Sequence, residues 1–239
     1  MKKKTCVVIP CYNVKKKILS VLNSKYLSKI DKIILIDDKC PENTGLFLKK
    51  KIGKNNRFKI IIHKKNLGVG GATISGLKYA LKKNFYMVYK VDGDGQHDLS
   101  VLKKFKNEII SGKSDFCKGY RNLTFKQSQK TGIPLIRLIG AKGLTLLTRI
   151  NSGFWKLQDP CHGLIGFNFE ILKKLDLKNI KNNYFFEQDI ILNIIKLNGR
   201  VKQFRNEVTY SDESSKLNPL LSIVPFLYYH IIVFLKKFM

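Results

Sequence analysis

Residues 88–98, VYKVDGDGQHD, are the most informative part of the chain for its fold. An apolar run ends there in two carboxylates, Asp92 and Asp94, which are separated by a single glycine. A buried strand that stops in this way typically ends at an open edge of a sheet, so we expect both side chains to point into a cleft. Together with the Gln96 amide oxygen they offer hard oxygen ligands for one divalent cation, with positions left open for phosphate oxygens. The stretch therefore predicts a site for a metal and a diphosphate.

Two other structures begin with a similar motif. An EF-hand loop also starts Asp-x-Asp, but it requires a glycine where His97 stands and a bidentate glutamate where Lys103 stands, so this interpretation fails. A solvated β-turn stays open as an alternative, because Asp-Gly turns are common on protein surfaces.

The chain on either side alternates between apolar strands and amphipathic helices. We predict strands over 6–9, 32–36, 58–62 and 86–91, with helices between and after them. The first of these helices should carry Ile18, Leu22 and Leu27 on one side. Strands that are apolar throughout indicate an α/β fold in which helices cover both faces of a parallel sheet. Ligands of such sheets bind beyond the carboxyl ends of the strands, where this chain places its paired aspartates.

The glycine-rich turn after the third strand raises the possibility of a dinucleotide site. Gly68 and Gly70 have the first spacing of that motif, but Thr73 occupies the position of the third small residue. A Rossmann dinucleotide site is therefore disfavoured.

Charge restricts the partners of this chain. The formal net charge is +28, which implies an acidic partner such as nucleic acid, an anionic lipid surface or a phosphorylated substrate. The lysines are scattered in short clusters, and the sequence has neither an aromatic RNP motif nor a zinc-finger pattern. We therefore do not expect a nucleic-acid-binding module.

Cysteine usage and the N-terminus indicate the compartment. The five cysteines are irregularly spaced without a C-x-x-C pair, which favours a reducing compartment and no disulfide framework. The N-terminus lacks the longer apolar region of a signal peptide. We expect a cytoplasmic location.

Several short motifs follow one another along nearly the whole chain. They are 7–13, 36–38 with 43–44, 66–72 with 76–77, 92–97, 119–121, 134–149, 159–160 with 163, 186–187, and 210 with 212–215. In this order they resemble the family 2 glycosyltransferases, and among these the polyprenyl-phosphate branch of dolichol-phosphate mannose and glucose synthases. The resemblance implies a GT-A fold, a Rossmann-like sheet that binds a nucleotide sugar with Mg or Mn.

The resemblance also assigns residues to the donor and the metal. It places the nucleotide sugar against Pro10, Tyr12, Asn13, Asp37, Asp38, Gly70 and Asp92. Asp38, with Asp37 beside it, would contact the base or ribose. The metal on the diphosphate would be held by Asp92, Asp94 and Gln96, the same three residues that the acidic stretch predicts by itself.

The acceptor decides what further chemistry is needed. A lipid phosphate is already an anion near neutral pH, so it requires positioning by cations rather than a general base. Arg121, Arg137 and Arg149 match cationic positions of the family, and arginine suits bidentate phosphate contacts. If the acceptor is a sugar hydroxyl, a carboxylate must remove its proton, and Asp189 or Glu187 is the candidate. We therefore predict Asp94, Arg121 and Asp189 as the catalytic residues.

The chain departs from the family pattern in three places. Residues 39–41, Lys-Cys-Pro, replace the commoner Gly-Ser, and Ile165 stands where many relatives carry arginine. The paired transmembrane helices that follow the catalytic domain in many lipid-directed members are not expected. These departures bear more on the lipid acceptor than on the transferase fold.

The last segment, 217–239, follows a catalytic domain that we expect to span 1–216. Prolines at 219 and 225 should break its first part and leave an uninterrupted helix over 226–238. This helix is too short to cross roughly 30 Å of hydrocarbon at about 1.5 Å per residue. We predict that it lies at the interface of an anionic membrane and holds the site there. The alternative is a helix packed back on the domain.

The sequence thus predicts a metal-dependent, inverting glycosyltransferase. It would move a hexose from a nucleotide sugar to a polyprenyl phosphate, peripheral to the cytosolic face of a membrane. Transfer to a hydroxyl of a growing cell-surface glycan is the alternative. No oligomeric state is predicted.

Overall fold

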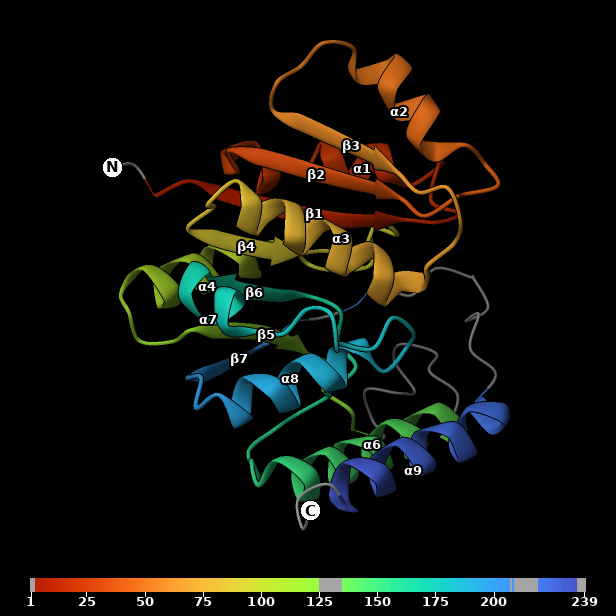
Figure 1. The fold of residues 1–239 in the computed structure, drawn as a ribbon, viewed down its shortest axis with the longest axis vertical. Coiled ribbons are helices and arrows are strands. Elements are labelled where there is room, and N and C mark those ends of the chain that lie inside the picture. Colours follow the sequence, from red (N-terminus) through yellow and green to blue (C-terminus); the bar gives the residue numbers. More distant parts are fainter. Residues whose placement is uncertain (1–2, 125–134, 207, 209–218, 236–239) are drawn as a thin grey trace.

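The computed structural model describes residues 3–124, 135–206, 208 and 219–235, and a mixed sheet runs through its centre (Figure 1). The sheet has seven strands in the order β3-β2-β1-β4-β6-β5-β7. The strands are β1 Thr5–Cys11, β2 Lys32–Asp37, β3 Phe58–Ile62, β4 Met87–Lys90, β5 Phe116–Tyr120, β6 Ile165–Asn168 and β7 Val201–Arg205. Only β6 runs antiparallel to its neighbours, β4 and β5. The predicted α/β fold with a mostly parallel sheet is confirmed.

Helices cover both faces of this sheet, as the apolar strands predict. They are α1 Ile18–Leu22, α2 Thr44–Ile52, α3 Gly68–Lys82, α4 Val101–Ile110, α6 Leu135–Ser152, α7 Phe169–Lys174, α8 Phe186–Lys196 and α9 Pro219–Leu235. Ile18 and Leu102 belong to the core on the face of α1, α2 and α4. Leu77 and Ile190 belong to the core on the face of α3, α7 and α8. The predicted strand 58–62 matches β3, and the other three predicted strands differ from β1, β2 and β4 by one or two residues at an end.

The first helix is shorter than its apolar periodicity suggests. α1 ends at Leu22, and Leu27 opens a separate turn of 3-10 helix, Leu27–Lys29. The Ser24 amide closes α1 by donating to the Val21 carbonyl at 3.1 Å. Leu27 is still buried in the same core as Ile18. The periodicity therefore predicts the burial correctly, and the expectation of one continuous helix is wrong.

The C-terminal helix starts earlier than predicted. α9 begins at Pro219 and continues through Pro225, although a proline inside a helix removes one backbone hydrogen bond at a cost of about 3 kcal/mol. Phe226, Tyr229 and His230 are buried beyond it, and their packing stabilises the helix across the proline. The predicted start at residue 226 is wrong. The predicted domain boundary at residue 216 lies outside the described residues.

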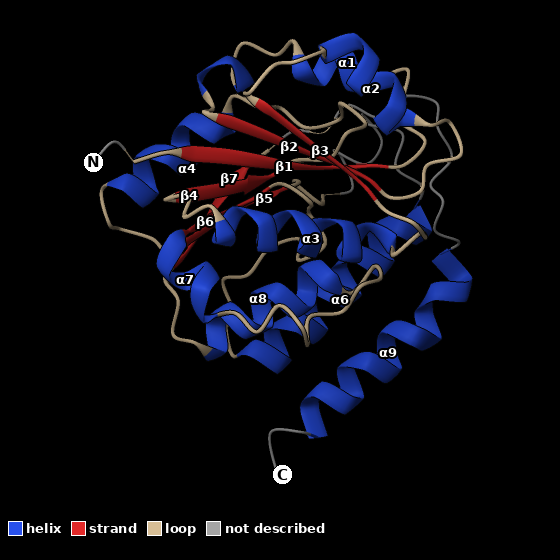
Figure 2. Ribbon diagram, turned by 45° about the horizontal axis from the view of Figure 1, so that its top comes forward, coloured by secondary structure: helices blue, strands red, loops and turns tan. Residues whose placement is uncertain are grey.

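α9 lies beside α6, and the two helices sit on the outer side of α8 (Figures 1 and 2). The partners of α9 on the domain are polar as well as apolar. His230 Nε2 lies 2.9 Å from Gln188 Oε1, and His230 Nδ1 lies 2.8 Å from Asn151 Nδ2. Over the ranges that the structure describes, no helix combines the length and the apolar character needed to cross a membrane.

Candidate active site

The polar ends of three neighbouring strands meet at one edge of the sheet. β1 pairs in parallel with both β2 and β4. The Asp38 amide donates to the Cys11 carbonyl at 3.1 Å, and the Val91 amide donates to the Val8 carbonyl at 3.0 Å. These bonds bring the turn after β1, the paired aspartates after β2 and the acidic loop after β4 to the same edge. The predicted convergence at the carboxyl ends of the strands is therefore present.

Lys90, the last residue of β4, is a fully buried cation beneath the acidic loop. Its Nζ lies 2.6 Å from Asp92 Oδ1 and 3.5 Å from Glu187 Oε1. Burial by itself would lower the pKa of Lys90, but the two carboxylates outweigh it and raise that pKa. Burial would likewise raise the pKa of Asp92, yet Lys90 and His97 outweigh it and lower that pKa to about 2. Asp92 is thus held ionised by an internal ammonium.

Asp94 is the second carboxylate of the loop. Burial and the neighbouring Asp92 charge raise its pKa, and its Oδ1 accepts a hydrogen bond from the Gln96 amide at 3.0 Å. A cation would relieve the repulsion between the two carboxylates, so their chemistry fits a hard divalent metal. Within the described ranges no group of three or more His, Cys, Asp or Glu side chains could hold such an ion by itself. Asp92 and Asp94 by themselves would supply only part of the coordination shell of such an ion, and metal binding here stays a prediction.

A layer of histidines lies behind Asp92. The rings of His97 and His162 stack with their centroids 4.9 Å apart, and His97 Nε2 lies 3.4 Å from Asp92 Oδ2. Burial lowers the pKa of both histidines, which favours neutral rings at neutral pH. Close packing leaves no room for a larger residue at Gly163, where an added Cβ would lie 2.2 Å from Asp92 Oδ2.

Glu187, at the start of α8, is the carboxylate that reaches this group. Burial raises the pKa of Glu187 to about 7, against the opposing effect of Lys90. A carboxylate with this pKa can accept a proton at neutral pH. The sequence names Glu187 as a candidate base, and the structure places it 3.5 Å from the Lys90 ammonium.

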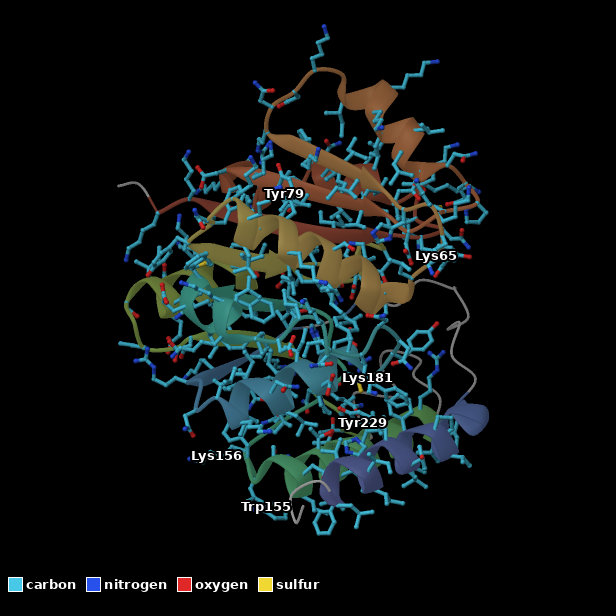
Figure 3. The ribbon with its side chains drawn as sticks, in the orientation of Figure 1. Lys65, Tyr79, Trp155, Lys156, Lys181 and Tyr229 are labelled. Atoms are coloured by element: carbon cyan, nitrogen blue, oxygen red, sulfur yellow. The ribbon has the colours of Figure 1, made fainter. Side chains whose placement is uncertain are left out.

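Asp189, two residues further on, is already engaged. Its Oδ1 accepts a hydrogen bond from the Tyr229 hydroxyl at 2.8 Å, and its Oδ2 accepts one from the Lys181 amide at 2.9 Å. Both partners are labelled in Figure 3. These bonds tie α8 to α9 and to the loop before α8. They give Asp189 a structural part; its catalytic role stays a prediction, and Glu187 is the better candidate for a proton acceptor.

Arg121 follows β5 and is oriented by a buried carboxylate. Its Nε and Nη2 donate to Asp159 at 2.7 and 2.8 Å. Burial would raise the pKa of Asp159, but Arg121 outweighs it and holds that pKa well below its usual range. Lys118, whose pKa burial lowers to about 8, fixes the same loop by donating to the Asp159 carbonyl at 2.7 Å. Contact between Arg121 and an acceptor phosphate stays a prediction.

The other two predicted arginines both lie on α6. Arg137 and Arg149 are twelve residues apart, which separates them by about 18 Å along the helix axis. Arg149 Nε donates to the Leu157 carbonyl at 2.8 Å and so ties α6 to the turn after it. The contact of Arg137 and Arg149 with an acceptor phosphate stays a prediction, and the bond to Leu157 gives Arg149 a structural part as well.

The two aspartates after β2 have different surroundings. Asp37 accepts hydrogen bonds from the Cys40 amide, at 2.7 Å, and from the Gly45 amide, so both of its oxygens serve the backbone. Asp38 Oδ1 accepts from the Leu67 amide at 2.9 Å and lies 2.7 Å from His63 Nδ1. Donor binding by either aspartate stays a prediction, and Asp38 is the one whose Oδ2 receives no hydrogen bond from a described residue.

The remaining predicted donor residues fall into two groups. Tyr12 is exposed on the turn after β1, and Asn13 has a positive φ of 54°, while Pro10 lies just before them in β1. Gly70 instead meets protein, since an added Cβ would lie 2.6 Å from the Asn182 backbone. Gly70 therefore lies at a packing position against the loop before α8, and its contact with the donor stays a prediction.

The geometry of these residues agrees with a comparison against known families. The model of glycosyl transferase family 2 matches residues 6–176, a range that includes Asp38, the acidic loop, Arg121 and Asp159. The chain belongs to glycosyl transferase family 2. The resemblance on which the sequence-based prediction rests is confirmed, and the chain is a glycosyltransferase.

Two relatives within family 2 illustrate the range of similarity. The UDP-N-acetylglucosamine–dolichyl-phosphate N-acetylglucosaminyltransferase of Methanococcus voltae is 32% identical over 181 residues, which cover 71% of each chain. The polyprenol monophosphomannose synthase of Mycolicibacterium smegmatis is 24% identical over 190 residues, covering 78% of this chain and 70% of the relative. The activities in these two names are those of the relatives.

The solved structures of other glycosyltransferases agree with the fold. Glucosyl-3-phosphoglycerate synthase from Mycobacterium tuberculosis with UDP superimposes with a TM-score of 0.70 at 16% identity, covering 96% of this chain and 80% of that one. Its complex with Mn²⁺ and UDP-glucose gives 0.68 at 13% identity, with coverages of 96% and 79%. The GT-A fold that the family implies is confirmed.

Proposed function

We propose that this family 2 glycosyltransferase moves a sugar from a nucleotide-sugar donor to a polyprenyl phosphate, in a metal-dependent and inverting reaction at the cytosolic face of a membrane. The acceptors named for two relatives support the lipid phosphate. The observation that carries the proposal is an apolar surface formed by α6 and α9, tied to the site through α8.

The donor would lie across the carboxyl ends of β1, β2 and β4. Asp38 and the exposed Tyr12 would contact the nucleoside, and Asp92, Asp94 and Gln96 would hold Mg or Mn on the diphosphate. When bound, that ion would stabilise the charge that develops on the leaving nucleoside diphosphate. The internal Lys90 would keep Asp92 ionised and in place for this task.

Inversion requires a single displacement at the anomeric carbon. An oxygen of the acceptor phosphate would form the new bond while the bond to the donor diphosphate breaks. A phosphate needs no proton removed, so the protein has to orient the acceptor. Arg121 would take this role, and its bidentate pairing with Asp159, which fixes the guanidinium, supports the assignment.

The outer face of α9 supports a lipid acceptor. Its exposed apolar residues are Val224, Leu227, Tyr228, Ile231, Phe234 and Leu235. Spacings of three and four residues place them on one side of the helix, opposite the buried Tyr229 and His230. One face of α9 is packed on the domain, as in the alternative prediction. The opposite face is apolar and exposed, which supports the predicted interfacial helix.

α6 extends this surface. Its exposed apolar residues are Leu135, Ile136, Ile139, Leu146 and Ile150, and Lys142 is exposed among them. We call the exposed side chains of α6 and α9 the apolar platform. An apolar surface beside lysines is the composition that suits a helix lying in an anionic membrane interface. The net charge of +28 would draw the whole protein to the same surface.

A transfer assay tests the proposal. The protein would be incubated with anionic vesicles that carry polyprenyl phosphate and with radiolabelled UDP-N-acetylglucosamine, UDP-glucose or GDP-mannose, with Mn²⁺ or with chelator. We expect one labelled sugar to extract with the lipid, and we expect the chelator to stop the transfer. If label instead appears on a glycan hydroxyl, with Glu187 as the base, the alternative function replaces this one. If no donor is used with either acceptor, both functions fail.

Replacing Ile231 by glutamate should weaken binding to anionic vesicles roughly tenfold or more. The substitution removes apolar area that the membrane would bury, and it adds a negative charge that anionic lipids repel. Ile231 is 55% exposed, so the fold should tolerate the change. Flotation with anionic vesicles measures the loss. Leu46→Glu is the matched control, since Leu46 is 58% exposed but lies on α2. Equal flotation of both variants would remove the apolar platform from the membrane contact.

A further inference from the structure

His63 forms part of a hydrogen-bonded chain that links β2, the end of β3 and α3. Its Nδ1 lies 2.7 Å from Asp38 Oδ1, and its Nε2 lies 3.0 Å from Ser75 Oγ. The His63 amide donates to the Asp37 carbonyl at 2.8 Å, which extends the pairing of β2 and β3 by one residue. Lys65, labelled in Figure 3, marks the loop that follows. Both ring nitrogens and the backbone of His63 are therefore fixed.

The order Asp38, His63, Ser75 matches the catalytic triad of a serine hydrolase, but the surroundings of Ser75 do not. Ser75 lies in the middle of α3, where the neighbouring backbone amides are used within the helix. No pair of free amides is available there to stabilise an oxyanion. The chain of hydrogen bonds therefore orders Asp38 instead of activating Ser75.

The two carboxylate oxygens of Asp38 differ in their hydrogen bonding: Oδ1 has protein partners, and Oδ2, the open oxygen, has none among the described residues. Oδ1 receives His63 and the Leu67 amide, while no described residue donates to Oδ2. The Asp38 side chain is only 4% exposed, and that of His63 is 10% exposed. A carboxylate so placed at the carboxyl end of β2 has a fixed orientation and can accept one further N–H or O–H group. In its neighbour Asp37, by contrast, each oxygen already accepts a hydrogen bond from a backbone amide.

We propose that His63, backed by Ser75, is a positioning residue that fixes Asp38 so that its open oxygen selects donor bases carrying a ring N–H. Uracil, thymine and guanine present such a hydrogen at N3 or N1. Cytosine and adenine present a lone pair at the corresponding ring nitrogen, and a lone pair facing a held carboxylate is repelled. The proposal rests on the proposed function, because it assumes that the donor nucleoside lies against Asp38.

The rigidity of this arrangement is what gives selectivity. A carboxylate free to rotate could turn away from a base that cannot donate, and the penalty for the wrong base would be small. In Asp38, the His63 ring and the Leu67 amide both bind Oδ1, so the carboxylate cannot rotate without breaking two hydrogen bonds. Sites built to pair a ligand N–H discriminate strongly for this reason.

The test is calorimetric binding of UDP, GDP, CDP and ADP, with Mn²⁺, to the full chain. In the wild type we expect UDP or GDP to bind at least about tenfold more tightly than CDP and ADP. His63→Leu should reduce that ratio to within about threefold. His63→Asn should restore most of it, since asparagine places an amide N–H near the position of Nδ1. The exposed Lys65→Leu, in the same loop, should leave the ratio unchanged.

Each outcome bears on one claim. If His63→Leu weakens all four nucleotides equally, or leaves the ratio as it was, the role of His63 is overturned while nucleotide binding stands. If the wild type binds none of the four, the proposed function itself fails. Should His63→Leu not fold, as judged by thermal unfolding, Ser75→Ala replaces it. This variant should shift the ratio in the same direction by a smaller factor, and an unchanged ratio would overturn the proposal.

Discussion

Asp94→Asn should lower sugar transfer by about 10³-fold or more while the protein keeps its fold. A neutral amide cannot supply the charge that holds a divalent ion on a diphosphate, and the loss of one such electrostatic contact typically costs at least about 10²-fold in rate. Affinity for Mn²⁺ in the presence of a nucleoside diphosphate should fall in parallel. Asparagine can still accept the hydrogen bond from the Gln96 amide, so thermal unfolding should change little.

The matched control for this variant is Asp98→Asn, four residues along the same segment. Asp98 Oδ1 accepts a hydrogen bond from the Ser100 amide, and Oδ2 accepts one from the Ser100 hydroxyl, just before α4. Asparagine can accept the first bond through Oδ1 and donate to the hydroxyl through Nδ2 in place of the second. Transfer and Mn²⁺ affinity should stay near the wild-type values. If Asp94→Asn transfers sugar normally and still needs the metal, Asp94 is not a metal ligand.

Lys90→Met should destabilise the protein by about 3–5 kcal/mol, because it removes the partner of a largely buried carboxylate and leaves a side chain of similar length without charge. Asp92 lies 2.6 Å from the lysine, and Glu187 lies 3.5 Å from it. Both would lose their internal counter-ion. Denaturant unfolding at neutral pH gives the loss directly.

A double variant separates this pairing from simple packing. Lys90→Met combined with Asp92→Asn removes the cation and one anion together, so it should be more stable than Lys90→Met alone. A coupling of about 1–3 kcal/mol is expected for groups in direct contact. If the two single losses merely add, or if Lys90→Met unfolds like the wild type, the internal ion pair does not stabilise the acidic loop.

The order of strands and helices could be predicted because each element depends on the apolar pattern of its own residues. The apolar run before Asp92 ends one residue beyond β4, and the predicted strand 58–62 is β3. The convergence of the acidic turns then follows from parallel pairing, which brings the carboxyl ends together. The antiparallel placement of β6 has no such local signal, since it depends on how the long segment through α6 returns to the sheet.

The partners of the site residues could not be predicted for the same physical reason. Lys90 meets Glu187 across 97 positions of sequence, and Arg121 meets Asp159 across 38. Nothing local distinguishes Asp189, tied to Tyr229, from Glu187, which faces the acidic loop. One clue to Lys90 was present, because a lysine two positions before Asp92 in an otherwise apolar strand has to be buried and therefore paired.

The two-sided nature of α9 matters for protein engineering. Its outer face carries exposed apolar side chains, which are the usual targets for removal when a protein has to be made more soluble. Its inner face supplies His230 to Gln188 and Asn151, and Tyr229 to Asp189. A chain shortened before α9 would lose the exposed apolar face but would uncover a second surface. On that surface the Gln188 and Asn151 amides and the Asp189 carboxylate would lack their α9 partners. Two of these residues lie on α8, the helix that carries Glu187. Point changes on the outer face are therefore the sounder route to a more tractable protein.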